Sequence, residues 1–177
     1  MISKQKRRFM YRIKLATGEY AMVDDDDRDL GLLRWTYFEK KYAGRSRHIR
    51  IAKNRYSSET IFMHHIVLER VVGNVKWSRD LMCDHINNDK LDNRRSNLRL
   101  ATRSDNMMNT RLRVHNTSGY TGVSFSKERR KYAAAIGKCG IYYSVGRFGS
   151  KEEAAWMRDQ WAIELHGEFA CLNFDYQ

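Results

Sequence analysis

A polar segment in the middle of the chain holds the residue types that divalent-metal phosphodiester chemistry requires. The pair Asp84-His85 follows an apolar stretch, and Asn97 and Asn106 come later in the same segment. A hard cation such as magnesium takes few protein ligands and keeps several waters, so one carboxylate and one amide oxygen suffice to hold it. A neighbouring imidazole, with an ordinary pKa of about 6.5, suits proton transfer near neutral pH.

Three short elements are expected to position these side chains. Residues 81–85 predict a strand, residues 97–100 an antiparallel partner strand, and the capping pattern at 102–105 a helix that contains Asn106 and Asn109. Because adjacent strand residues point to opposite faces, the acid and the imidazole of the pair are expected to have different roles.

This pattern resembles the HNH nuclease motif, in the variety found in phage and intron homing endonucleases. The resemblance rests on Asp84-His85, on Asn97 twelve residues after His85, and on Asn106 nine residues further. The segment 63–67 is similar to the apolar, histidine-containing segment that precedes the motif in that family. The resemblance implies a ββα finger and a metal-dependent DNA endonuclease that hydrolyses a phosphodiester bond at a preferred DNA site.

Alternation and resemblance together assign the roles. Asp84 and Asn106 are expected to bind one Mg²⁺ or Mn²⁺ ion per active site, and His85 to take a proton from the attacking water. Asn97 resembles the middle asparagine of the motif, whose side chain would brace the loop and orient His85. Many family members have histidine where this chain has Asn106, so Asn109 stays open as the second ligand.

The segment before the motif has apolar residues at three- and four-residue spacing. This pattern predicts an amphipathic helix over residues 64–72. His64 and His65 lie where that helix begins. Each is either a packed core histidine or a metal ligand or phosphate contact, and the resemblance points to His64 as the more important of the two.

The charge of the chain indicates a polyanionic partner. The 177 residues carry a net charge of +12, of which residues 1–60 contribute +7, residues 61–116 +4 and residues 117–177 +1. A merely soluble basic protein is the alternative. No apolar run approaches membrane length, the N-terminus lacks a signal-peptide stretch, and three scattered cysteines form no C-x-x-C pair. We expect a monomer or weak dimer that binds double-stranded DNA, without membrane or small-molecule cofactor, in the cytoplasm of a bacterial or phage-infected cell.

The first 60 residues predict a small antiparallel sheet. Residues 8–23 form a candidate hairpin, and the acidic run 24–27 is expected to open a short helix. Strand-like pieces follow near residues 35–38, 48–52 and 60–63. Basic turns between them offer phosphate contacts, or else a solvated edge: Lys40, Lys41, Arg45, Arg47, Lys53 and Arg55.

Arginines surround the motif, and guanidinium groups match phosphate geometry. Some are expected to be solvated surface charges and at least two to contact the DNA backbone: Arg94, Arg95, Arg99, Arg103, Arg111 and Arg113.

The last third of the chain predicts three antiparallel strands over residues 120–125, 131–136 and 141–146, followed by a helix that a capping box opens at 150–153. Met157, Trp161 and Leu165, with Ala154, are expected on its buried side. Residues 119–174 resemble an Apetala-two (ethylene-response-factor-type) DNA-binding domain, but the outer sheet face has small and hydroxyl residues where plant members have arginine and tryptophan. A DNA-docking module with modest sequence preference follows from that departure. A packing domain that does not contact DNA is the alternative. The expected contacts are Lys127, Arg129, Arg130, Tyr142 and Arg147.

Together these patterns predict an α+β protein with an N-terminal β-rich region (1–60), an HNH module (61–113), a linker (114–118) and an Apetala-two-type domain (119–177). The predicted function is a homing-type HNH endonuclease. The alternatives are a DNA-binding regulator whose nuclease fold does not cut, and RNA cleavage, which lacks the support of an aromatic stacking platform.

Overall fold

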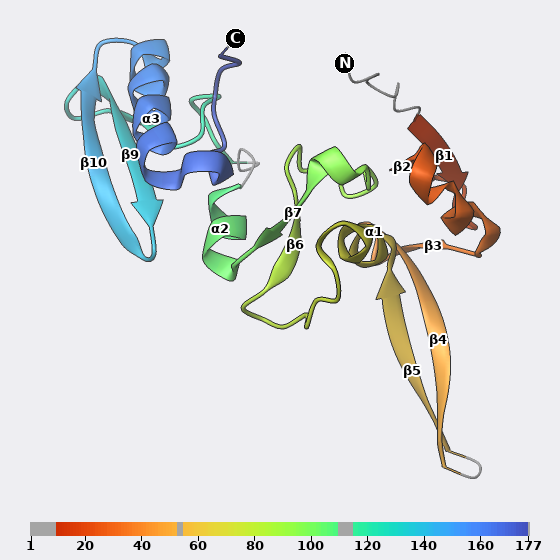
Figure 1. The fold of residues 1–177 in the computed structure, drawn as a ribbon. Helices are drawn as coiled ribbons and strands as arrows, with labels where there is room; N and C mark the ends of the chain where they lie inside the picture. Colours follow the sequence, from red (N-terminus) through yellow and green to blue (C-terminus); the bar gives the residue numbers. More distant parts are fainter. Residues whose placement is uncertain (1–9, 53–54, 110–114, 177) are drawn as a thin grey trace, which may run out of the picture. The chain divides into compact units, whose positions relative to one another are not determined.

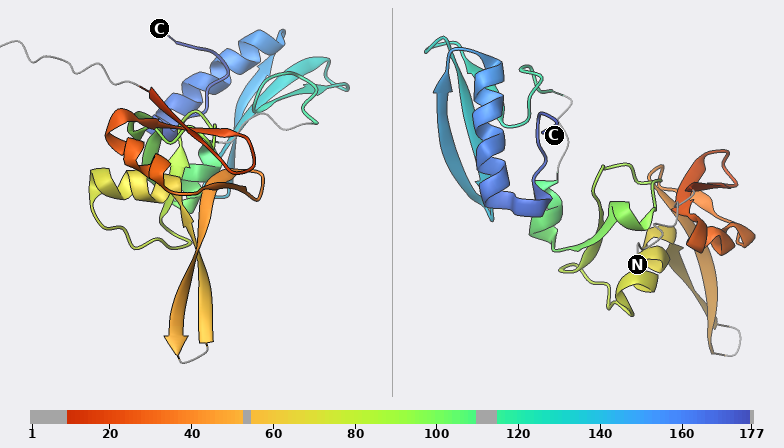
Figure 2. Two further views of the ribbon diagram at one scale, coloured as in Figure 1. Left: turned by 90° about the vertical axis from the view of Figure 1, so that its right-hand side faces the viewer. Right: turned by 45° about the horizontal axis from the view of Figure 1, so that its top comes forward.

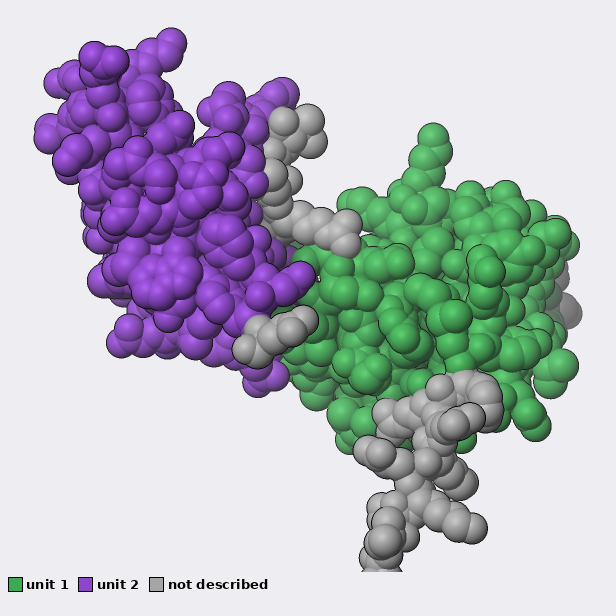
Figure 3. All heavy atoms as spheres, turned by 90° about the horizontal axis from the view of Figure 1, so that it is seen from above, with its two compact units in different colours: residues 1–100 green, residues 101–177 purple. Residues whose placement is uncertain are grey.

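The computed structural model describes residues 10–52, 55–109 and 115–176. The chain forms two compact units, residues 1–100 and 101–177 (Figure 3). Several small antiparallel sheets and few helices make up a mixed fold, in agreement with the predicted α+β class (Figure 1). None of the described helices has the length and apolarity to cross a membrane.

The first unit begins with the expected hairpin. Strands β1 (Met10–Lys14) and β2 (Tyr20–Asp24) pair antiparallel, and the 3₁₀ helix η1 (Asp25–Leu32) follows. Its core is built from apolar side chains of the hairpin, η1 and helix α1 (Met63–Val72). The indole of Trp35 is buried there and donates a hydrogen bond to the Leu30 carbonyl at 2.7 Å.

The acidic run has a different role from the predicted one. Although η1 does begin there, Asp27 is fully buried and accepts hydrogen bonds from Arg70 (2.9 Å) and Arg95 (2.7 Å). A buried carboxylate requires such partners, because its desolvation is costly without a compensating charge. Asp27 therefore ties η1 to α1 and to the segment before β7, beyond any effect on the helix dipole.

A second sheet has the order β3-β4-β5, with β3 at Thr36–Phe38, β4 at Tyr42–Ala52 and β5 at Arg55–Phe62. Beyond their roots, β4 and β5 continue as a long two-stranded ribbon that projects from the unit (Figures 1 and 2). Arg45, Arg47 and Arg55 thus lie in strands, so the prediction of turns at these residues is wrong; Lys40 and Lys41 do lie in a turn. Lys53 lies outside the described residues.

The motif segment folds as two strands and a helix. Strand β6 (Met82–His85) pairs with β7 (Leu98–Ala101) in a two-stranded sheet, and Asn97 ends the short 3₁₀ helix η2 (Arg95–Asn97). In the second unit, α2 (Arg103–Met108) has Thr102 and Asp105 as a reciprocal capping box. Asn106 is within this helix, whereas Asn109 is its C-cap residue and not a helical one.

The rest of the second unit is a three-stranded antiparallel sheet in the order β10-β9-β8, with α3 packed against it. The strands are β8 (Val123–Ser126), β9 (Lys131–Lys138) and β10 (Ile141–Phe148); α3 spans Lys151–His166 and η3 Gly167–Phe169. In the predicted linker, Asn116 and Ser118 both hydrogen-bond to the Tyr120 carbonyl; Val114 lies outside the described residues.

The buried side of α3 differs from the predicted one. Ala154 is buried as expected, but Met157, Trp161 and Leu165 are only partly buried, and Arg158 and Asp159 are buried instead. Asp159 accepts hydrogen bonds from Asn173 and Phe174 and so attaches the C-terminal segment to the helix. The spacing of apolar residues cannot predict a buried helix face when the residues at its centre form an ion pair.

Candidate active site

Strand β6 places Asp84 and His85 side by side in the chain, and neither is exposed. The strand continues into pairing with the segment before β7, since the Ile86 amide donates to the Asn97 carbonyl at 2.9 Å. The nine residues from Asn87 to Arg95 form the loop between these two elements. The geometry of the site depends on how that loop is held.

Asn97 holds the loop from its far end. Its Oδ1 accepts from the Asn87 amide at 2.9 Å, and its Nδ2 donates to the Asp92 carbonyl at 2.7 Å. Asn87 Nδ2 in turn donates to Asp92 Oδ2 at 2.8 Å, and Leu91 N donates to Asp89 Oδ1 at 3.0 Å. Side-chain amides and carboxylates thus replace the missing backbone ladder of the loop.

Arg94 and Arg95 are engaged by carboxylates. Arg94 donates from Nε and Nη2 to the two oxygens of Asp92, at 2.7 and 2.6 Å. Burial alone would raise the pKa of Asp92, but the hydrogen bonds from Arg94 hold it below its ordinary value. Arg95 donates to Asp27 from its side chain and to Asp24 from its amide, at 2.7 Å. Both arginines therefore have a structural role in the loop, and as DNA contacts they stay predictions.

The loop also pairs with the N-terminal hairpin. The Met22 amide donates to the Leu91 carbonyl at 2.8 Å, and the Asn93 amide donates to the Met22 carbonyl at 2.7 Å. These backbone hydrogen bonds place β2 beside the motif loop, a contact that no local sequence pattern indicates. The N-terminal hairpin is thus a support for the motif loop.

Asp84 is paired with Arg99 of β7. Arg99 donates from Nε (3.0 Å) and Nη2 (2.8 Å) to Asp84 Oδ2, and both side chains are nearly inaccessible to solvent. A guanidinium donating two bonds to one carboxylate is a charge-assisted contact. The predicted metal ligand and a predicted DNA contact thus meet in one ion pair.

His85 contacts Asn93 at the other end of the loop, with 3.3 Å between Nε2 and Oδ1. Burial lowers the pKa of His85 from its ordinary value to about 4, and the charge of Lys90 acts in the same direction. The imidazole is therefore neutral near pH 7. With its proton on Nε2, the ring donates to Asn93 and has its lone pair on Nδ1.

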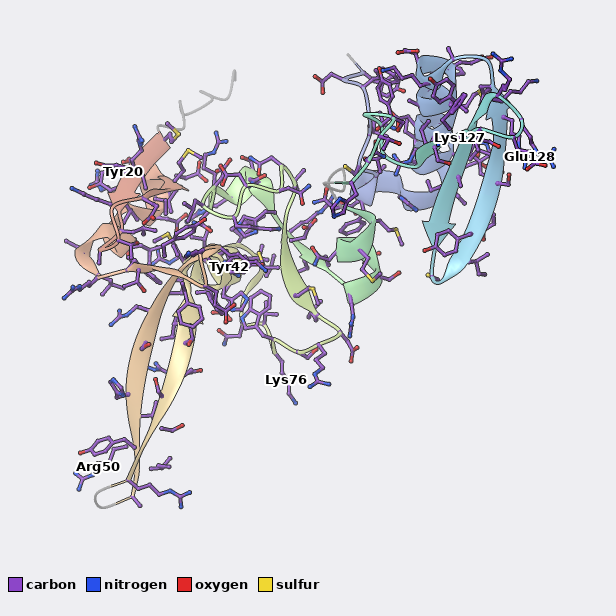
Figure 4. The ribbon with its side chains drawn as sticks, turned by 180° about the vertical axis from the view of Figure 1, so that it is seen from behind. Tyr20, Tyr42, Arg50, Lys76, Lys127 and Glu128 are labelled. Carbon is purple, nitrogen blue, oxygen red and sulfur yellow. The ribbon has the colours of Figure 1, made fainter. Side chains whose placement is uncertain are left out.

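Aromatic side chains from the root of the ribbon surround the histidines. Phe62 stacks on His64 with ring centroids 5.4 Å apart. The ring centroid of Tyr42, which Figure 4 labels, lies 5.0 Å from that of His64 and 6.2 Å from that of His85. Burial holds the pKa of His64 well below its ordinary value. His65 stacks on Trp77 at 4.1 Å, and burial lowers its pKa to about 4. Both histidines are packed in this cluster.

Asn106, Asn109 and Arg103 belong to the second unit and are described with it. Asn106 is partly buried in α2, Asn109 is buried at its C-cap, and Arg103 is exposed in the first turn. Among the described residues, no group of three or more His, Cys, Asp or Glu side chains is arranged to hold a metal ion. The predicted ligands, one carboxylate and one amide oxygen, are not a group of that kind and stay a prediction.

Sequence reasoning missed two members of the site. Asn93, the partner of His85, lies in a loop rich in Asn and Asp, where no spacing distinguishes it from its neighbours. Tyr42 lies 43 residues before His85 in the chain, and only the pairing of β4 with β5 brings it close. An aromatic residue that follows the basic turn at Lys40 and Lys41 was the signal that the sequence offered for Tyr42.

A comparison with known proteins places this geometry in a family. The profile of the HNH endonuclease family matches residues 62–108, the segment from the start of α1 to the end of α2. The chain is 37% identical over 98 residues to an HNH endonuclease of Acanthamoeba polyphaga mimivirus, which covers 55% of this chain and 50% of that protein. It is 36% identical over 87 residues to Protein 3.8 of Escherichia phage T7, which covers 49% of this chain and 71% of that protein.

The chain belongs to the HNH endonuclease family. It spans half the length of the mimivirus relative, so the matched segment defines a nuclease domain and not the whole of that protein.

Proposed function

We propose that the protein is a metal-dependent DNA endonuclease of the homing type, which hydrolyses a phosphodiester bond at a preferred site. The observation that carries the proposal is the buried pair Asp84-His85, with a neutral imidazole held through Asn93. Its position inside the segment that matches the HNH endonuclease profile supports the same conclusion.

His85 acts as the general base in this proposal. With Nε2 donating to Asn93 Oδ1, the ring is oriented and its Nδ1 lone pair takes the proton of a water that attacks the scissile phosphate. Asn97 acts through the loop, because its two hydrogen bonds fix the path of residues 87–92 and thereby the position of Asn93. Asn93 and Asn97 are thus positioning residues.

A hard divalent cation suits the predicted ligand types. Asp84 and Asn106 would hold Mg²⁺, or Mn²⁺ in its place, because both present hard oxygen ligands; Asn109 is the alternative second ligand. A buried carboxylate needs a neighbouring positive charge, which Arg99 supplies in this structure. When bound, the ion stabilises the negative charge that develops on the phosphate and on the leaving oxygen.

The second unit is proposed to add DNA affinity as an Apetala-two-type domain. The hairpin between β8 and β9 exposes Lys127, which Figure 4 labels, together with Arg129 and Arg130. Tyr142 and Arg147 are exposed on β10. Arg103 at the start of α2 adds a further exposed cation. Such groups suit phosphate oxygens, and their number favours double-stranded DNA as the partner.

The test is the conversion of supercoiled plasmid to open-circle or linear DNA, with magnesium, with manganese and with a chelator. His85→Ala is compared with His115→Ala, which removes an exposed histidine of the second unit. We expect metal-dependent cutting that His115→Ala retains and His85→Ala loses. The ratio of open circle to linear product distinguishes a nick from a double-strand break.

A second outcome would support a DNA-binding regulator instead. If the parent protein binds duplex DNA in a salt-sensitive manner but leaves plasmids with candidate insertion sites uncut at any metal concentration, the nuclease proposal fails. If the protein cleaves RNA in preference to DNA, the proposed substrate is wrong, whereas the proposed phosphodiester hydrolysis stands.

A further inference from the structure

The ribbon formed by β4 from Arg45 to Ala52 and β5 from Arg55 to Ile61 is exposed on both faces over most of its length. Every described residue from Ser46 to Ala52 and from Arg55 to Glu59 is exposed. Figures 1 and 2 show the ribbon extending away from α1 and from the rest of its unit. A two-stranded hairpin is only marginally stable in water. Packing therefore does not explain its length or its side chains.

The two faces of the ribbon differ. Cross-strand partners share a face, and the register places Arg50 opposite Tyr56 and His48 opposite Ser58. No carboxylate interrupts this face, which we name the reading face; the residues that form it are Ser46, His48, Arg50, Tyr56, Ser58 and Thr60.

The opposite face carries Arg45, half-buried at the root of the ribbon across from Ile61, and one ion pair. Arg47 lies across from Glu59, and Arg47 Nη2 donates to Glu59 Oε2 at 2.7 Å. Ile49 lies next along the same face, across from Ser57. The exposed arginine of this face is thus bound to a carboxylate, whereas Arg50 on the reading face lies across from Tyr56 and shares its face with no acidic residue.

The reading face continues at the root of the ribbon into the candidate active site. Phe62, opposite Gly44, and Tyr42 extend that face, and their rings contact His64; Tyr42 also approaches His85. Figure 4 shows Tyr42 at the root and Arg50 near the far end. A ligand lying along the reading face would therefore extend to the aromatic cluster that borders the predicted general base.

The dimensions and charge of the ribbon fit double-stranded DNA. Residues 45–61 include five Lys or Arg and one acidic residue, Glu59. The major groove of B-DNA, about 12 Å wide, admits a two-stranded ribbon, whereas the deep and narrow major groove of A-form RNA does not. A strand rises about 3.4 Å per residue, so Arg50 lies roughly 27 Å along the ribbon from Tyr42. That length corresponds to roughly eight base pairs at about 3.4 Å each.

We propose that the ribbon is a DNA-reading arm whose reading face enters the major groove, with Arg50 making the strongest base contact. The proposal rests on the proposed nuclease function. It adds that the recognised bases lie on one side of the cut, within about one helical turn. Arg50 is suited to a bidentate contact with guanine, and Tyr56 lies across the ribbon to support its guanidinium.

The test compares two conservative substitutions that keep the charge. Arg50→Lys removes the guanidinium fork from the reading face, and Arg47→Lys does the same on the opposite face. Duplexes with a random central segment are selected by binding in chelator and sequenced, so that the readout does not depend on cutting. Thermal unfolding verifies that each variant is folded.

We expect the parent to prefer defined bases within a block of about eight base pairs. Arg50→Lys should reduce the preference at one position roughly ten- to hundredfold while keeping most of the affinity, and Arg47→Lys should leave the preference unchanged. The proposal is overturned if both variants behave alike, if Arg50→Lys leaves the preference intact, or if single- or double-stranded RNA competes better than duplex DNA. Absence of cutting together with the expected preference would refute the nuclease proposal alone.

Discussion

The ribbon of β4 and β5 and the sheet of β8, β9 and β10 each expose one face to solvent. They differ in what lies against the opposite face. The ribbon of β4 and β5 has solvent on both sides. The sheet of β8, β9 and β10 has α3 packed on its inner side, where Ala134 and Ile136 are buried. On its outer side, Ser144 lies opposite Ala135 and Arg147 opposite Ala133.

This comparison distinguishes side chains that stabilise the fold from side chains that are available for binding. The C-terminal sheet obtains its stability from α3, so small residues on its outer face cost little, and the phenol of Tyr142, 82% exposed, is its largest outer group. The ribbon gains little from packing and nevertheless holds an arginine, a histidine and a tyrosine on one face. We therefore expect base recognition from the ribbon and mainly backbone contacts from the C-terminal sheet.

The largest expected effect tests whether DNA cleavage at His85 is independent of DNA binding by the two sheets. His85→Ala should lower the rate of DNA cleavage by about a hundredfold to ten-thousandfold, because the general base is lost. Binding of duplex DNA in chelator should stay at the parental level, since His85 is buried and does not belong to either exposed face. A parallel loss of binding in gel-shift titrations would mean that the site and the docking surfaces are not independent.

A stability comparison sharpens the contrast between the two sheets. Asp159→Ala should destabilise the second unit by roughly 3–5 kcal/mol, because Arg158 would remain buried without its charge partner. Glu59→Ala on the exposed ribbon pair should cost at most about 1 kcal/mol. Urea unfolding followed by fluorescence measures both, and equal losses would contradict the difference in packing.

A smaller effect is expected from one added methyl group in the C-terminal unit. Gly122 has φ +76°, and a Cβ there would lie 2.6 Å from the Ala135 carbonyl oxygen. Gly122→Ala should therefore destabilise that unit by about 1–3 kcal/mol. Ser58→Ala on the ribbon, where the side chain is exposed, is the matched control and should unfold like the parent. A Gly122→Ala variant with parental stability would show that the sheet can relax.

The smallest effect concerns the outer face of the C-terminal sheet. Arg147→Ala should weaken duplex binding several-fold at every sequence and lower the slope of log affinity against log salt by about 1, as expected for one lost phosphate contact. Base preference in the sequencing selection should not change. A shift in preferred bases would assign recognition to this sheet as well and remove the proposed division between the two surfaces.

Local patterns predicted the elements that depend on neighbouring residues. The capping box of Thr102 and Asp105, the alternation of β9 and the strand that ends at His85 all follow from spacings of two to four residues, over which backbone geometry alone fixes the direction of side chains. The HNH family was likewise evident from Asp84-His85 and the later asparagines, and the family profile matches that segment.

Tertiary structure alone decided which charges pair. Arg95 and Asp27 are 68 residues apart, and Arg99 and Asp84 are 15 apart, so no periodicity indicates that these guanidinium groups are held by carboxylates. The sequence predicted strands only near residues 48–52 and 60–63 and missed the full length of the ribbon for a related reason: strands with solvent on both faces lack the apolar alternation that identifies half-buried strands. Residue types and local spacing thus determined the chemistry that the chain offers, whereas folding decided which arginines stabilise the site and which remain exposed.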